Sequence, residues 1–280
     1  MNVTVIIATA FRRTQWIVER SLASVYQQKK CNPKDISILI VDDNVDDREM
    51  TILQNKIMLL RHELHLKEDE FRTHILKNKR TRFMSGTGAW NTGLYESFAR
   101  HPDGFVSLLD DDDEYLPNHL FDCISRIDAR TTAVFQSLFW LHSDGSTMEL
   151  PLSLDQLTPR HFFVGNPGVQ GSNMFFKTAS LIAIDGFDES LPNTTDRDLM
   201  IRFLNYSHFM DKKNHIVIVP DYGVRHHNHA CEKVNTNLPL KQKGLDLFYQ
   251  KFKSQFTEDD YLKSVERAKA FFLYQPTIVS

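Results

Sequence analysis

Three short apolar runs lie in the first 110 residues, and each ends in a turn or in acidic residues. They cover 3–8, 36–41 and 105–109 and are rich in Val, Ile and Leu. Runs of this length and composition predict strands that are buried on both faces. Stretches with helical spacing or helix-forming composition separate them, at about 14–28 and 46–70. Strand, helix and strand in alternation predict right-handed parallel crossovers, the unit of a doubly wound α/β sheet.

The rest of the chain continues this alternation with shorter elements. Near the C-terminus, apolar residues recur at helical spacing between 245 and 265, which predicts two amphipathic helices that pack on the body or on a partner. The other expected elements are strands at 71–76, 132–140, 173–177 and 216–220, and helices that end near 100, cover 118–130 and begin near 196.

An acidic run, 110–114, directly follows the third apolar run. Carboxylates crowded at the end of a buried strand repel one another and resist desolvation. A divalent cation relieves the crowding, because hard cations take oxygen ligands, and Asp110 and Asp112 are spaced to reach one ion. The alternative is a solvated acidic turn or a helix N-terminus. The second apolar run also ends in acid, at Asp42 and Asp43, so a ligand site is expected beyond the carboxyl ends of these strands.

Composition narrows the class of function. A formal net charge of −3 and the lack of a dense basic stripe give no case for nucleic acid. No apolar run approaches the roughly 20 residues that cross a bilayer, and the N-terminus lacks a basic signal-type region. We therefore expect a cytoplasmic protein without a membrane span, with peripheral docking at the inner face of the membrane left open. Three scattered cysteines exclude a disulfide framework and a four-cysteine zinc site.

Five segments stand in a recognisable order: a strand and helix (5–9 with 21–25), an acid-terminated strand (38–43), a glycine–asparagine turn (88–93), an Asp-x-Asp run with flanking Leu and Pro (108–117), and a region with paired acids (186–199). In this order they resemble the motifs of inverting nucleotide-sugar glycosyltransferases of the GT-A fold, of the family 2 type. Two positions depart from that family. Trp90 stands where an Arg commonly precedes the family's Asn, here Asn91, and Thr195 stands where the family usually has Glu before its catalytic Asp.

The resemblance covers about 3–229 and implies the fold and the domain organisation. It implies a Rossmann-like, mostly parallel mixed sheet flanked by helices. The glycosyltransferase domain is expected at 1–235, with a nucleotide-binding half at 1–130 and an acceptor-binding half at 131–235. A C-terminal helical extension is expected at 236–280, and its apolar face makes a homodimer possible.

The resemblance also implies the activity: metal-dependent transfer of a sugar, with inversion, from a UDP-sugar to an acceptor hydroxyl. The acceptor could be a glycan, a lipid-linked glycan, a peptide or a small molecule. The metal, Mn²⁺ or Mg²⁺, is expected on Asp112 and Asp110, with His226 completing its shell, although His227, His229 or none of the three could do so. Donor-binding residues are expected at Ala8, Thr9, Phe11, Arg13, Asp42, Asp43, Trp90, Asn91, Asp110, Asp111 and Ser172.

Inversion needs a base that takes the proton of the acceptor hydroxyl. The resemblance assigns this role to Asp196, with Asp198 as the next candidate. Both acids would otherwise be ordinary residues of a helix N-terminus. Two other functions stay open. A sugar-phosphate nucleotidyltransferase needs a basic glycine-rich loop near the N-terminus, and 8–13 contain no Gly. The other is a catalytically inactive carbohydrate-binding module on the same fold.

Overall fold

The computed structural model describes residues 1–10, 12–82, 85–209, 215–228 and 237–276. Phe11 and His229, both named as candidate site residues, lie outside the described residues, as does Cys231. None of the described helices is long and apolar enough to cross a membrane.

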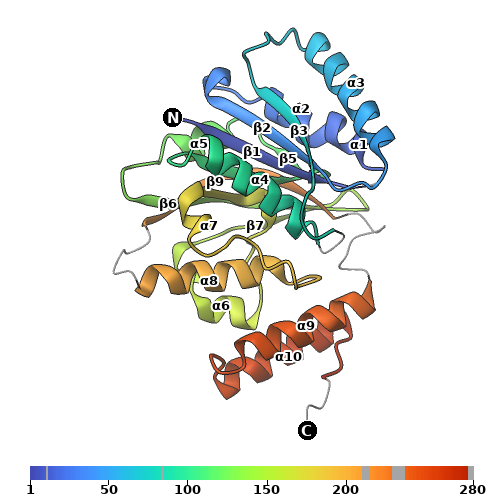
Figure 1. Ribbon diagram of the computed structural model, residues 1–280. Coiled ribbons are helices and arrows are strands. Elements are labelled where there is room, and N and C mark those ends of the chain that lie inside the picture. Colours follow the sequence, from blue (N-terminus) through green and yellow to red (C-terminus); the bar gives the residue numbers. More distant parts are fainter. Residues whose placement is uncertain (11, 83–84, 210–214, 229–236, 277–280) are drawn as a thin grey trace.

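The described strands form one mixed sheet in the order β3-β2-β1-β4-β8-β6-β9-β5, with β7 paired to β6 (Figure 1). The first four are mutually parallel, and β8 runs antiparallel between β4 and β6. The predicted α/β class and mostly parallel sheet are therefore confirmed. The strands are β1 (Val3–Thr9), β2 (Ile36–Asp42), β3 (Arg72–Lys77), β4 (Phe105–Asp110), β5 (Glu114–Tyr115), β6 (Thr131–His142), β7 (Thr147–Leu150), β8 (Met174–Lys177) and β9 (His215–Asn228).

Helices cover both faces of this sheet, which is why β1 and β2 are continuously apolar. Side chains alternate between faces along a strand, so Val5 and Ile7 enter one apolar cluster and Ile6 enters the other. The helical elements are α1 (Thr14–Trp16), a π-helical turn (Ile17–Ser21), α2 (Leu22–Tyr26), α3 (Asp47–Glu63), α4 (Thr87–Arg100), α5 (His119–Ile124), α6 (Pro159–Val164), α7 (Thr178–Ile182), α8 (Thr195–Phe209), α9 (Leu238–Phe252) and α10 (Glu258–Phe272).

The last strand differs from the sequence expectation. A strand over 216–220 was expected to end at Pro220, with a histidine cluster following it. The structure instead continues β9 through Pro220 to Asn228. The pairing of β9 with β6 passes from Val219 directly to Tyr222, so Pro220 lies in a bulge. Strand pairing requires no backbone N–H at that position, which is why a proline is tolerated there. His226 and His227 consequently lie within the strand and face opposite sides of the sheet.

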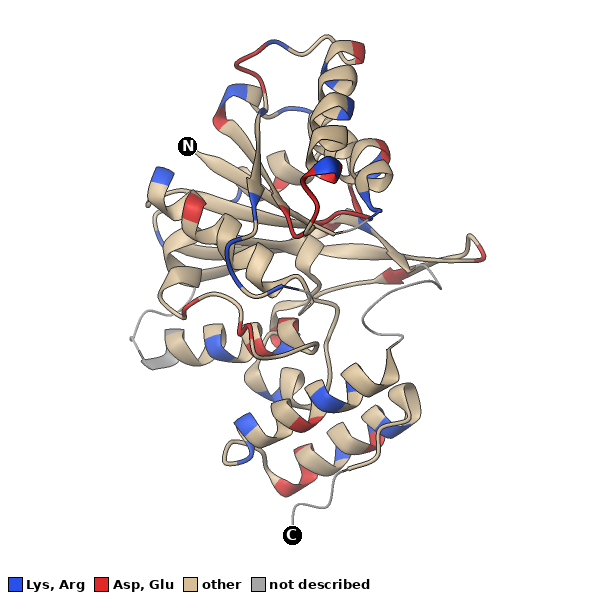
Figure 2. Ribbon diagram, turned by 45° about the vertical axis from the view of Figure 1, so that its right-hand side comes forward, with Lys and Arg blue, Asp and Glu red and all other residues tan. Residues whose placement is uncertain are grey.

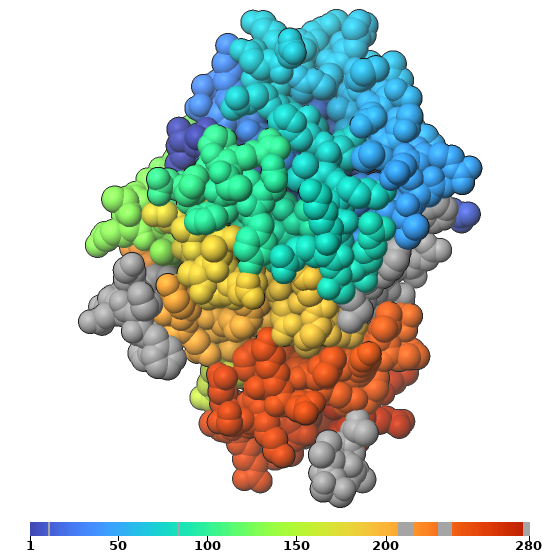
Figure 3. Space-filling model, in the orientation of Figure 1, coloured from blue at the N-terminus to red at the C-terminus, as the bar shows by residue number. Residues whose placement is uncertain are grey.

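The two predicted C-terminal helices are present as α9 and α10, and they pack on the body of the same chain. Phe248 and Phe252 of α9 and Val265 of α10 share an apolar cluster with Phe203 of α8. Phe163 of α6 lies 5.8 Å, between ring centroids, from Phe252. Figure 3 shows these helices as an orange and red block in direct contact with the yellow residues of the body. The domain boundary at 235 and the homodimer remain predictions.

Candidate active site

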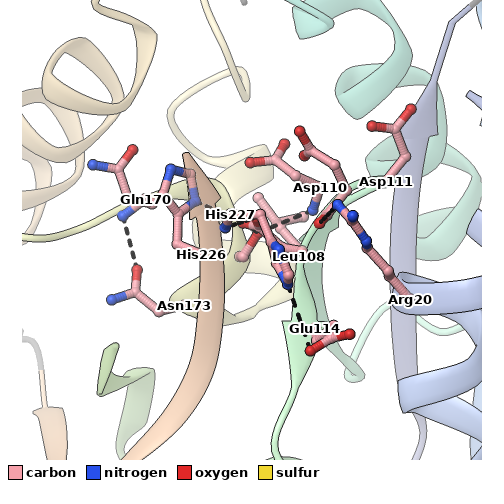
Figure 4. A network of polar contacts seen from close by, with 12 residues as sticks. Arg20, Leu108, Asp110, Asp111, Glu114, Gln170, Asn173, His226 and His227 are labelled. Carbon is pink, nitrogen blue, oxygen red and sulfur yellow. Dashed lines mark hydrogen bonds and ion pairs between the residues drawn. The ribbon is translucent and has the colours of Figure 1, made fainter. Parts of the chain in front are cut away.

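Asp110, Asp113 and His226 lie together at the carboxyl end of β4. The chain turns back after β4, with the Asp113 amide donating to the Asp110 carbonyl at 3.2 Å. This turn brings the two carboxylates close to His226 of β9, so that one ligand atom from each residue lies within 4.8 Å of the others. Figure 4 shows Asp110 at the end of β4 and His226 on the neighbouring β9. Because two carboxylates and an imidazole suit Mn²⁺ among other divalent cations, the cluster fits the expected metal.

Asp113 is fully buried and holds the cluster in place. Its Oδ2 accepts hydrogen bonds from Ser172 Oγ at 2.6 Å and from His226 Nδ1 at 2.7 Å. Its Oδ1 accepts from the His227 amide at 2.9 Å. With Nδ1 of His226 donating to a carboxylate, Nε2 keeps the lone pair that a metal ion takes. Asp113 was not predicted as a ligand from the sequence, although three residues is the spacing at which a tight turn returns a chain to a strand end.

Asp110 is the crowded member of the cluster. Burial, then the charges of Asp113 and Asp112, raise its pKa well above the usual value, and His226 opposes this. Among the described residues, no hydrogen bond or ion pair is made by its carboxylate, while its amide donates to Ser172 Oγ at 3.0 Å. A divalent cation would relieve the repulsion. The expected metal role of Asp110 therefore has a physical basis in this structure.

Asp111 and Asp112 lie on the side of the run that faces the first helix. Arg13 Nη1 is 2.7 Å from Asp111 Oδ1 and 3.9 Å from Asp112 Oδ2. Burial raises the pKa of Asp111 to about 6, against the opposing effects of Arg13 and Thr9. Arg20 donates to the Asp112 carbonyl at 3.5 Å. The structure thus groups Asp113, rather than Asp112, with Asp110 and His226, and Asp112 as a metal ligand remains a prediction.

The predicted nucleotide residues of β1 and β2 lie at the same edge of the sheet. Ala8 is paired with Asp110, and Thr9 with Asp42. Asp42 accepts hydrogen bonds from Lys77 Nζ at 3.1 Å and from the Asn44 amide at 3.0 Å. Acidic segments, in red, gather near the middle of the view in Figure 2. Asp43, also buried, accepts from Asn78 Nδ2 at 2.6 Å.

Trp90 and Asn91 are neighbours in sequence, but their side chains contact different parts of the structure. A Cβ added to Gly171 would lie 3.6 Å from Asp110 Oδ2 and 3.8 Å from Trp90 Cζ2, so the indole borders the acidic cluster. Asn91 instead accepts from the Phe187 amide at 2.8 Å and donates to the Phe187 carbonyl at 2.9 Å and to Glu189 at 2.8 Å. Its side chain ties α4 to the loop before α8.

Asp196 and Asp198, the two candidate bases, differ completely in their surroundings. Among the described residues, no hydrogen bond or ion pair is made by the Asp196 carboxylate. Burial raises its pKa to about 6, while His226 and Lys241 oppose this rise. Asp198 is fully buried, with Arg202 Nη2 at 2.7 Å and Lys251 Nζ at 2.5 Å. Asp198 is thus paired with two cations, whereas Asp196 is not, and the charge of Asp196 contributes to the raised pKa of Asp110.

Lys241 of α9 is a site residue that the sequence analysis missed. The residue is 7% exposed, and burial, then Arg197, lower its pKa to about 8, while Asp196 raises it. The position could have been noticed in the sequence, because Lys241 shares its helix face with Leu245, Phe248 and Phe252. A lysine on the apolar stripe of an amphipathic helix is buried when the helix docks.

Comparison with known proteins identifies the family. Residues 4–185 match the family model for glycosyl transferase family 2. The chain belongs to this family. No curated protein sequence matches it.

Solved structures show the same fold at low sequence identity. TarS from S. aureus superposes with a TM-score of 0.58 at 14% identity, and the match covers 99% of this chain but 49% of the TarS chain. Its 1–349 fragment, in complex with UDP-GlcNAc, gives a TM-score of 0.61 at 13% identity over 97% of this chain and 80% of the fragment. A mannosyltransferase from Pyrobaculum calidifontis, with GDP-Man and Mn²⁺, gives 0.58 at 16% identity over 97% and 69%. The chain therefore has the GT-A architecture and spans about half the length of that TarS chain.

Proposed function

We propose that this family 2 chain is a metal-dependent inverting glycosyltransferase that uses a nucleotide-sugar donor, with a UDP-sugar as the first choice. The observation that carries the proposal is the grouping of Asp110, Asp113 and His226 within 4.8 Å, next to a second carboxylate, Asp196, that has no ion pair among the described residues. Inverting transfer needs a metal site for the leaving diphosphate and a carboxylate that accepts the proton of the acceptor hydroxyl, and these residues would supply both.

Asp110, Asp113 and His226 would hold the divalent metal, with Asp112 as the further ligand predicted from the sequence. When bound, the ion supplies positive charge that stabilises the diphosphate as it leaves. Ser172 and His227 support this set by holding Asp113 from two sides. Arg13 neutralises Asp111 at the other end of the run, which limits the charge crowded around the donor.

Asp196 would accept the proton of the acceptor hydroxyl. With a pKa of about 6, its carboxylate is mostly ionised at neutral pH and remains a useful proton acceptor. Asp198 is unsuited to this role because Arg202 and Lys251 stabilise its anion and occupy its oxygens. This difference favours the first of the two candidate bases.

The nucleotide would lie over the ends of β1 and β2. Ala8 and Thr9 would line the base pocket, and Asp42 would accept a hydrogen bond from a uracil-type base. Trp90 and Ser172 border Asp110, where the sugar diphosphate would lie. The complexes of the neighbouring structures, UDP-GlcNAc and GDP-Man, support both nucleotides as trial donors.

The test is a donor screen with water as the default acceptor. The protein is incubated with UDP-GlcNAc, UDP-glucose or GDP-mannose, each with Mn²⁺, with Mg²⁺ or with EDTA, and release of the nucleoside diphosphate is measured. We expect slow release from one donor, dependent on metal. Release of pyrophosphate from a nucleoside triphosphate and a sugar phosphate would indicate a nucleotidyltransferase instead. Silence with every donor, together with tight glycan binding, would indicate an inactive carbohydrate-binding module.

A further inference from the structure

The segment that precedes Asp196 is strained. Thr194 has a φ of 66°, in the left-handed region, directly before α8. A β-branched residue in this region is sterically strained and persists only where its surroundings enforce it. The Thr194 carbonyl also accepts the Asp198 amide at 3.1 Å, so the strained residue sets the first turn of α8. The direction of Asp196 therefore depends on what holds Thr194.

The start of α9 holds this turn through Asn193. Asn193 is buried, and its Nδ2 donates to the Leu240 carbonyl at 2.5 Å, while its Oδ1 accepts from Thr194 Oγ1 at 2.7 Å. Gly244, one helical turn further along α9, allows this close approach. A Cβ there would lie 2.4 Å from Asn193 Oδ1, which is closer than real Cβ contacts come. A turn at 193–194 is thus clamped by residues almost fifty positions later.

Lys241 lies in sequence between these two contacts, is buried, and is near enough to Asp196 for their charges to interact. Its ammonium lies 4.2 Å from the centroid of Phe272, and the charges of the buried Lys241 and the half-buried Asp196 attract each other. The residues that follow Asp196 are also held by the C-terminal helices. Arg197 donates to Ser264 of α10 at 3.2 Å, and Lys251 of α9 contacts Asp198.

We propose that the start of α9 is a positioning element for Asp196: Leu240 and Gly244 hold the strained Asn193–Thr194 turn, and Lys241 fixes the direction of the carboxylate. Asn193 and Lys241 are positioning residues, because they act through Asp196 and need not touch the donor. The inference rests on the proposed role of Asp196 and adds that the C-terminal helices complete the acceptor side of the site.

The first test replaces Lys241. Lys241→Met keeps the apolar stem and removes the charge, and Lys243→Met, two residues along on the exposed face, is the matched control. With the best donor of the screen and Mn²⁺, Lys241→Met should lower kcat for nucleotide release by roughly 10–100-fold, the cost of a misplaced catalytic group. KM for the donor and the affinity for UDP with Mn²⁺ should not change. Lys243→Met should match the wild type in all three.

The second test uses the strain itself. Asn193→Ala removes the clamp and should lower kcat in the same way. Thr194→Gly in that background should restore a large part of the loss, because glycine adopts a φ near 66° without strain. A residue with only a structural role would lower thermal stability without this split between kcat and UDP binding. Hydrogen exchange at the amides of 195–198 should rise in Asn193→Ala and not in Lys243→Met.

The outcomes separate the inference from the proposed function. If Asp196→Asn releases nucleotide as fast as the wild type, the base assignment fails and the positioning role fails with it. If Asp196→Asn is inactive but Lys241→Met and Asn193→Ala keep wild-type kcat, the base assignment stands and the positioning role is overturned. If the wild type releases no nucleotide from any donor, the hydrogen-exchange measurement still tests the inference. Unchanged exchange at the amides of 195–198 in Asn193→Ala would contradict the role of Asn193 in holding this turn, and an increase confined to 195–198 would support it.

Discussion

Two acidic segments meet at the site, the run 110–113 after β4 and the pair Asp196 and Asp198 at the start of α8. In each segment one carboxylate, Asp110 or Asp196, has no hydrogen bond or ion pair among the described residues. In each segment another acid is paired with cations: Asp111 with Arg13, and Asp198 with Arg202 and Lys251. A carboxylate that must bind a metal or take a proton cannot also be neutralised by a neighbouring cation, so on the proposed function this division separates the working groups, Asp110 and Asp196, from supporting ones.

The two segments differ in where their supporting partners come from. The run after β4 is supported by the sheet and its adjoining turns, through Arg13, Ser172 and His226. The pair at α8 is supported by Lys251 of α9 and by the residues of the same helix. The acidic run is thus supported within the sheet, whereas the pair at α8 is also supported by a C-terminal helix. On the proposed function, changes in that helix should affect proton transfer more than nucleotide binding.

The largest expected effect is that of Asp196→Asn. Losing a positioned base should lower nucleotide release by on the order of 10²–10⁴-fold. Binding of UDP with Mn²⁺, measured by calorimetry, should be unchanged, because Asp196 supports neither the metal nor the base pocket. Weaker UDP binding in this variant would indicate that Asp196 contributes to nucleotide binding, and would contradict the division of roles between the two acidic segments.

The metal side gives the next effect. Asp110→Asn should lower metal-dependent nucleotide release by on the order of 10²–10³-fold, since it removes charge stabilisation at the leaving group. Affinity for Mn²⁺, followed by electron paramagnetic resonance, should fall in parallel. Asp112→Asn sharpens the ligand set: a loss as large as that of Asp110→Asn would support the sequence-based choice of Asp112, and little change would support Asp113.

Asp198→Asn should act on stability rather than on chemistry. It leaves Arg202 and Lys251 beside a buried neutral amide, and breaking a buried charge pair costs about 3–5 kcal/mol. The free energy of unfolding from urea titration measures this loss. Asp196→Asn, the matched control two residues away, should be no less stable than the wild type at pH 7. Equal losses in the two variants would contradict the division into working and supporting acids.

The smallest effect is on pH dependence. Asp196 must be ionised to accept a proton, and its pKa of about 6 predicts that nucleotide release falls about tenfold per pH unit below that value. Lys241 and His226 lower this pKa and Asp110 faces the same carboxylate, so Lys241→Met should move the acidic limb to higher pH. Initial rates between pH 5 and pH 8 with saturating Mn²⁺ check this. A limb that moves to lower pH would contradict the assigned contact.

The sequence predicted the parts of the fold whose pattern is local. β1, β2 and β4 are buried on both faces and therefore read as continuous apolar runs, and α9 and α10 show a clear apolar stripe. The predicted strand ended at Pro220, eight residues before β9 ends, because a proline argues against a strand unless a bulge accommodates it. That bulge depends on the pairing of β9 with β6, which the local sequence does not reveal.

The site was predictable only as far as its chemistry is local. The acidic run and the pair at α8 were identified from the sequence. The choice between Asp196 and Asp198 depends on Lys251, and the burial of Lys241 depends on the docking of α9, so neither follows from neighbouring residues. Asp113 was missed because a turn, not the strand pattern, brings it back beside Asp110.

Calorimetric titration of UDP and of GDP into the wild-type protein, with Mn²⁺ and with EDTA, tests the central claim most directly. If Asp110, Asp113 and His226 grip a metal that holds a nucleoside diphosphate, one of the two nucleotides should bind at least about tenfold more tightly with Mn²⁺, a difference of about 1.4 kcal/mol. Equal affinity in Mn²⁺ and EDTA, or no binding of either nucleotide, would contradict it.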